Sequence, residues 1–93
     1  MDECSRERLA AANRVLEKLV STVDHRTSDP SVREHLRTTQ EAWTRYVHEA
    51  CLGEAALYEG GTMAPLVTTE CQRRLVKQRI RDVKLVYDEL LQR

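Results

Sequence analysis

The segment CLGEAALYEGGTMAPLVTTEC, residues 51–71, constrains the fold more than any other part of the chain. Cys51 lies ten residues before Gly61, and Cys71 lies ten residues after it. Glycine readily adopts the left-handed conformation that ends a helix, and proline is tolerated in a helix's first turn. The pair Gly60–Gly61 followed by Pro65 therefore predicts a chain reversal between two antiparallel helices, with one cysteine on each arm.

Three stretches of the chain carry apolar residues at the three- and four-residue steps of a helix face. The first stretch stops at DHRTSDP, where Asp29 is the expected N-cap of the second helix and Pro30 its first residue. A capping box formed by Ser31 and Glu34 is the competing start. We predict one all-α domain over residues 1–93, a small three-helix bundle with helices at roughly 5–25, 30–59 and 65–91. The residues expected in its core are Leu36, Trp43, Tyr46, Ile80 and Val83.

Composition excludes several classes of function. Fifteen basic residues balance fifteen acidic ones, so no net field attracts nucleic acid. The basic residues of the third helix lie opposite its apolar stripe, as on a solvated face. No apolar run approaches the ~20 residues of a membrane span. The start, MDECSRER, lacks the features of a secretory signal, so an exported chain would have lost its signal before this point.

The two hairpin cysteines are expected to lie level with each other. If the flanking helices end near Glu59 and begin near Ala64, each cysteine lies about 12 Å from the turn at ~1.5 Å per residue. A disulfide there would close a loop of about 20 residues and stabilise the fold by roughly 3 kcal/mol. It would also imply an oxidising compartment.

Level placement favours the disulfide, but other roles for these cysteines stay open. His48, Cys51 and Cys71 could supply three zinc ligands, although a fourth is missing. His48 and Cys51 could form a base–thiolate pair, although no oxyanion hole is evident. The two thiols could also stay reduced as small buried residues. Cys4 has no partner in the sequence.

The turn itself is a candidate surface for a protein partner. It combines apolar, aromatic and acidic residues at an expected exposed loop, although Met63 and Tyr58 could instead pack back on the helix ends. We call this candidate surface the tip; its predicted residues are Glu54, Tyr58, Glu59, Gly60, Gly61, Thr62 and Met63.

The pattern of residues 36–79 resembles the lysozyme inhibitor LprI-like N-terminal domain family. The matching positions are Leu36, Gln40, Trp43, Tyr46 and Cys51, then Gly60, Gly61, Thr62 and Pro65, then Cys71, Leu75 and Arg79. Three positions depart from the family pattern: Val47 and His48 replace an Arg-Asp pair, and Val76 replaces a threonine.

The resemblance implies a small helical bacterial protein, periplasmic or secreted, whose two hairpin cysteines are oxidised. Because one characterised branch of the family inhibits lysozyme, our leading hypothesis is a protein that binds and inhibits a cell-wall hydrolase of the lysozyme type. The expected mechanism is steric occlusion, and no cofactor is expected. The expected partner is therefore a protein, and we predict that the chain is not an enzyme. The alternatives are an immunity protein against a toxin that acts in the periplasm, and a purely structural or adaptor bundle.

Overall fold

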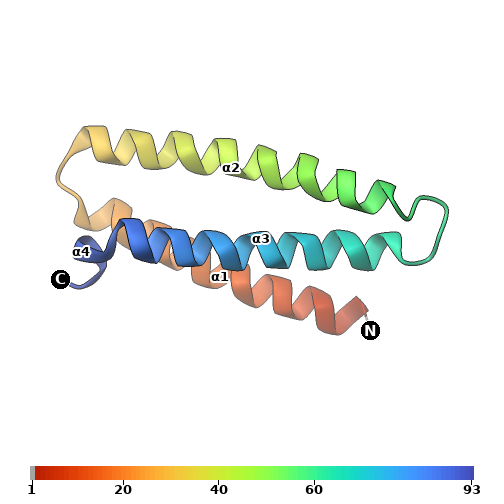
Figure 1. The fold of residues 1–93 in the computed structure, drawn as a ribbon. Coiled ribbons are helices and arrows are strands. Elements are labelled where there is room, and N and C mark those ends of the chain that lie inside the picture. Colours follow the sequence, from red (N-terminus) through yellow and green to blue (C-terminus); the bar gives the residue numbers. More distant parts are fainter. Residues whose placement is uncertain (1) are drawn as a thin grey trace.

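The computed structural model describes residues 2–93, which form three long helices and one short one (Figure 1). Helix α1 spans Asp2–Arg26, α2 spans Pro30–Ala56, α3 spans Ala64–Val86 and α4 spans Asp88–Leu91. Helices α2 and α3 form the antiparallel hairpin that the sequence predicts. The molecule is elongated, with extents of 49 × 23 × 16 Å, and the α2–α3 connection lies at one of its ends.

The connection between α1 and α2 is short and held by side chains. Asp29 is the N-cap of α2, as predicted: its Oδ1 accepts a hydrogen bond from the backbone N–H of Ser31 at 2.8 Å, and Pro30 opens the helix. Arg33 reaches back and donates hydrogen bonds to the carbonyl oxygens of Asp24 and Thr27. These bonds satisfy carbonyls at the C-terminus of α1, which would otherwise lack partners.

The ends of α2 and α3 differ from the sequence prediction. Helix α2 ends at Ala56 rather than at residue 59, and residues 57–60 form turns in which the N–H of Tyr58 bonds to the carbonyl of Ala55 at 2.9 Å. Gly60 then takes a φ of 84°, which reverses the chain in a conformation that favours glycine. The predicted third helix is interrupted at Tyr87, where φ of −107° and ψ of 27° leave the helical range and α4 begins.

Two clusters of buried side chains hold the helices together. The larger one consists of Leu16, Val23, Leu36, Val76 and Val83 and lies where all three long helices meet. The smaller one consists of Val47, Cys51, Cys71 and Leu75 and lies between α2 and α3, nearer the connection. Trp43 packs against both clusters, and Ile80 packs against the larger one.

The prediction that Tyr46 lies in the core is wrong. Its side chain is 59% exposed, whereas Val47 is only 8% exposed and belongs to the smaller cluster. The apolar stripe of α2 allows a step of three or of four residues after Trp43. The step of four places Val47 toward α3 and leaves Tyr46 on the outside.

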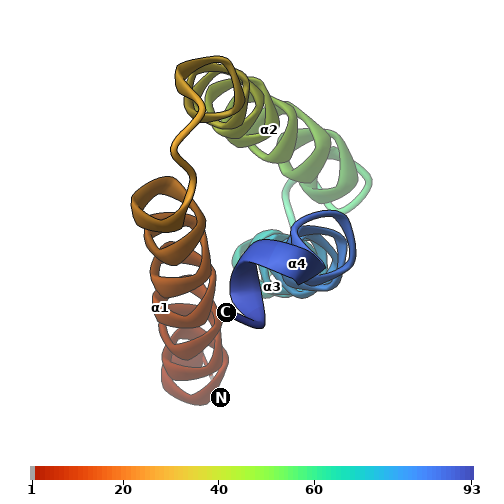
Figure 2. The same cartoon turned by 90° about the vertical axis from the view of Figure 1, so that its left-hand side faces the viewer.

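Helix α3 is the shared element of the bundle. Both α1 and α2 pack along it, whereas α1 and α2 make few contacts with each other. Seen nearly along the axis of α3, the other two helices diverge from their connection (Figure 2). Among the described residues, no helix is long and apolar enough to cross a membrane.

Candidate partner-binding surfaces

Cys51 and Cys71 form a disulfide that joins α2 to α3. Their Cα atoms lie 5.5 Å apart, and each residue is only 1% exposed. Because both sulfurs are bonded to each other, neither is available as a thiolate nucleophile or as a zinc ligand. The side chain of His48 is 70% exposed, and its one ion-pair contact among the described residues is with Glu49, at 4.0 Å. Cys4, in the first turn of α1, is a free and exposed cysteine.

An ion pair on the surface adds a second link across the hairpin, next to the disulfide. The guanidinium of Arg74 on α3 donates two hydrogen bonds to the carboxylate of Glu54 on α2, one of them at 3.2 Å. These hydrogen bonds lower the pKa of Glu54 below its ordinary value. Glu54 was predicted as part of the tip, but its charge is offset by Arg74 within the protein.

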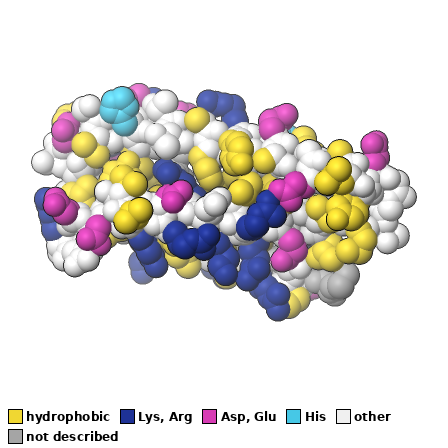
Figure 3. Space-filling model, viewed as in Figure 1, with side chains coloured by type: hydrophobic (Ala, Val, Ile, Leu, Met, Phe, Trp, Pro, Cys, Tyr) yellow, Lys and Arg dark blue, Asp and Glu magenta, His cyan; other side chains and the backbone are white. Residues whose placement is uncertain are grey.

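The tip lies at the narrow end of the molecule and exposes apolar side chains. Leu57 is 81% exposed, Tyr58 47% and Met63 46%. Glu59, Gly60, Gly61 and Thr62 are exposed as well. The space-filling view shows apolar side chains gathered toward this end, while Lys and Arg side chains gather over the middle of the same face (Figure 3). Leu57 was not among the predicted tip residues and belongs with them, because α2 ends one residue before it.

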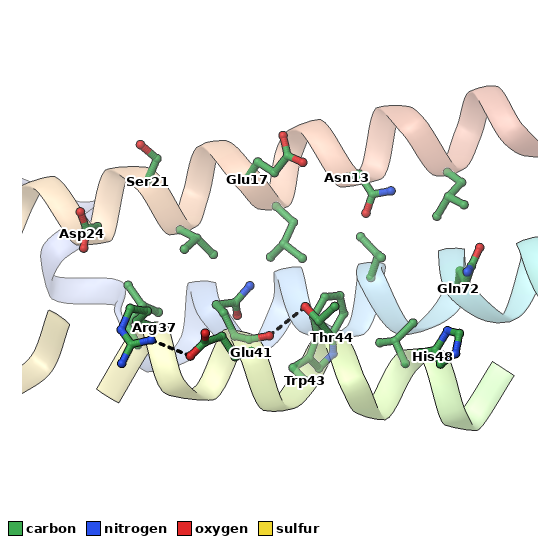
Figure 4. Close-up of a pocket in the computed structure, with 17 residues that line it drawn as sticks. Asn13, Glu17, Ser21, Asp24, Arg37, Glu41, Trp43, Thr44, His48 and Gln72 are labelled. Atoms are coloured by element: carbon green, nitrogen blue, oxygen red, sulfur yellow. Dashed lines mark hydrogen bonds and ion pairs between the residues drawn. The ribbon is translucent and has the colours of Figure 1, made fainter. Parts of the chain in front are cut away.

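A groove runs between α1 and α2, with α3 at its base (Figure 4). Its volume is about 870 Å³. The apolar lining residues are Leu9, Leu16 and Val20 from α1, Leu36, Trp43 and Val47 from α2, and Val76 from α3. The polar lining residues are Asn13, Glu17, Ser21, Asp24, Arg37, Gln40, Glu41, Thr44, His48 and Gln72. We call this surface the groove.

The charged side chains of the α2 wall are already paired. Arg37 donates hydrogen bonds to Glu34 and, at 2.7 Å, to Glu41. The hydrogen bond from Arg37 lowers the pKa of Glu34, and the bond to Glu34 raises the pKa of Arg37. Figure 4 shows the link between Arg37 and Glu41 along the edge of the groove. The guanidinium of Arg37 is therefore neutralised locally.

One polar contact ties the α2 wall of the groove to α3. The Nε of Arg79 donates a hydrogen bond to Oε1 of Gln40 at 2.6 Å, across 39 positions of sequence. The Nη2 atom of Arg79 is buried and has no hydrogen-bond partner among the described residues. The Gln40 side chain therefore connects α2 with α3 while it lines the groove.

Comparison with protein families matches residues 1–83 to the family described as lysozyme inhibitor LprI. The chain belongs to this family. The match includes α1, α2, the tip, the disulfide and all but the last turn of α3. No curated protein and no solved structure matches the chain. The family description names inhibition of an enzyme.

Proposed function

We propose that this chain is an exported protein that binds a cell-wall hydrolase of the lysozyme type and inhibits it by steric occlusion. Membership of the LprI family carries the proposal, because that family is described by lysozyme inhibition. The disulfide supports export, since structural disulfides persist mainly in oxidising compartments such as the periplasm. The proposed partner is therefore a protein that acts on the cell wall.

The tip is the part of the surface that we propose contacts the enzyme. It ends a molecule 49 Å long whose other extents are 23 and 16 Å, so it is narrow enough to approach a concave substrate cleft. Leu57, Tyr58 and Met63 offer apolar surface of the kind that anchors protein interfaces. Glu59 adds a charge without an ion-pair partner among the described residues, which would favour approach to a basic enzyme.

The disulfide and the Glu54–Arg74 pair support this role by holding the arms behind the tip. Both links lie on the hairpin within a few turns of the reversal. A rigid segment loses less conformational entropy on binding than a mobile one, so more of its contact free energy appears as affinity. We therefore propose that the hairpin presents a preorganised tip.

Two leucines of similar exposure provide a matched test. Leu57 at the tip is 81% exposed and Leu85 on α3 is 78% exposed. In a lysis assay with a peptidoglycan suspension, Leu57→Arg should weaken inhibition at least about tenfold, and Leu85→Arg should leave it within about twofold. Circular dichroism would verify that both variants keep the helical fold.

The outcomes separate the two parts of the proposal. Equal inhibition by the two variants would show that the tip is not the contact surface, while the proposal of inhibition would still stand. If the unmodified protein inhibits no lysozyme-type hydrolase, the proposal of inhibition is wrong. If the protein blocks only a hydrolytic toxin from a competing bacterium, it is an immunity protein rather than a lysozyme inhibitor.

A further inference from the structure

The groove has the length and shape needed to hold one further helix. On α1 its lining runs from Leu9 to Asp24, which is about 22 Å at ~1.5 Å per residue, or roughly four helical turns. On α2 the lining runs in the opposite direction, from Leu36 to His48. The two walls are thus antiparallel helices, both packed on α3. Three helices around an open fourth position are what remains of a four-helix bundle when one helix is absent.

The lining is apolar at depth and polar at the edges. Leu16, Leu36, Val47 and Val76 form its floor and are already buried within the bundle, whereas Leu9, Val20 and Trp43 stay partly exposed in the groove. In Figure 4 the apolar side chains of α1 project toward α2, whereas Glu17 and Ser21 lie along the outer edge of α1. An occupant must therefore present apolar groups inward and polar groups outward, as one face of an amphipathic helix does.

The α1 edge of the groove carries negative charge in a chain of zero net charge. The lining residues include three carboxylates, Glu17 and Asp24 on α1 and Glu41 on α2. Two of the three are paired with guanidiniums, Asp24 with Arg33 and Glu41 with Arg37. Glu17 takes part in no ion pair among the described residues. This charge favours an occupant with lysine or arginine beside its apolar face.

We propose that the groove binds an amphipathic helix of a protein partner, apolar on one face over about four turns and basic along the flank that meets α1. A second copy of this chain does not offer such a helix, because each long helix already buries its apolar stripe. The exposed large apolar residues of the chain are scattered over three helices and the tip rather than aligned in one stripe. This site is separate from the tip and does not depend on hydrolase inhibition.

A designed peptide of about 16 residues is the probe, with leucines at three- and four-residue steps and lysines on the flanks. Its control has the same composition in scrambled order. Trp43 is the chain's only tryptophan and lines the groove, so its fluorescence reports occupancy directly. The amphipathic peptide should change this fluorescence saturably, and the scrambled peptide should not. Leu57→Arg, which alters the tip, should leave this binding unchanged.

Two threonines of α2 give a matched pair of variants. Thr44 lines the groove, and Thr38 does not. Both are exposed, and the hydroxyl of each donates a hydrogen bond to the carbonyl four residues earlier, at 2.9 Å. Thr44→Arg should weaken peptide binding at least about tenfold, while Thr38→Arg should leave it within about twofold.

Two glutamates of α1 test the charge argument in the same way. Glu17 lines the groove, whereas Glu7 lies on α1 outside it, and both are exposed. Glu17→Lys should weaken binding of the lysine-flanked peptide by about threefold or more, and the loss should shrink as salt is raised. Glu7→Lys should have no effect.

Three results would overturn the proposal. Absence of saturable binding up to ~1 mM peptide would show that the groove does not accept such a helix. Equal binding of the ordered and scrambled peptides, or equal losses in Thr44→Arg and Thr38→Arg, would place the peptide elsewhere. A concentration-dependent dimer that Thr44→Arg abolishes would show that a second copy fills the groove instead.

Discussion

Removal of the Cys51–Cys71 disulfide should cost the protein a large share of its stability. The bridge joins residues separated by 20 positions. In the chain-entropy model a loop of that size restricts the unfolded chain by about 3 kcal/mol at 25 °C. Small domains have unfolding free energies of roughly 0.05–0.15 kcal/mol per residue, so a chain of this length is expected to have about 5–14 kcal/mol in total.

The packing around the bridge adds a second contribution. Both cysteines are 1% exposed and belong to a cluster with Val47 and Leu75, against which Trp43 packs. Replacement of both cysteines by alanine therefore removes sulfur contacts as well as the covalent link. Reduction of the unmodified protein breaks the link and keeps both sulfur atoms. The two perturbations together separate the effect of the link from the effect of packing.

The assay is urea unfolding followed by the helical circular dichroism signal, with Cys4→Ala as the background so that the free thiol cannot exchange with the bridge. Reduction should lower the unfolding free energy by about 3 kcal/mol, and Cys51→Ala/Cys71→Ala should lower it by at least as much. A loss below about 0.5 kcal/mol on reduction would refute the reasoning, because the bridge would then not restrict the unfolded chain.

Three further changes test other parts of the fold. Val83 is fully buried, so Val83→Ala should lower the unfolding free energy by about 2 kcal/mol. Val86 is 68% exposed, so Val86→Ala should lower it by less than about 0.5 kcal/mol. Urea unfolding measures both variants. Asp29→Ala removes the N-cap bond of α2 and should cost about 1 kcal/mol in the same assay. The folded-state pKa of Glu54 is lowered by Arg74, so the pair stabilises the fold above the ordinary glutamate pKa of about 4.3 and loses that effect as pH falls through the lowered value. Glu54→Gln should therefore flatten the acid side of a melting-temperature–pH curve, and an unchanged curve would contradict the pairing.

The hairpin could be predicted from the sequence because its signals are local. The two cysteines are equidistant from Gly61, and a proline follows that glycine by four residues. This pattern predicts the chain reversal and places the two sulfurs at the same height along the hairpin. The start of α2 was equally local, since Asp29 and Pro30 form a cap that needs no other part of the chain. The end of α2 was less certain, because residues 57–59 suit a helix as well as the turns that they form.

Side-chain orientation and the groove depend on how the helices meet. Either Tyr46 or Val47 could continue the apolar stripe of α2. Only the position of α3 relative to α2 decides that Val47 is the buried one, and the sequence of α2 alone does not give that position. The groove follows from the separation of α1 and α2, and sequence periodicity does not report that distance. Its nearest sequence signal was the presence of Gln40 and Thr44 beside the apolar stripe of α2, where a fully covered helix would carry apolar residues.

We propose that this member of the LprI family inhibits a lysozyme-type hydrolase by binding it. The most direct measurement is a titration of such a hydrolase with the oxidised protein, in which heat of binding and residual lytic activity are followed in parallel. We expect saturable binding and activity that falls to near zero at the equivalence point. Full activity at a large excess of the protein, with no heat of binding, would contradict this proposal.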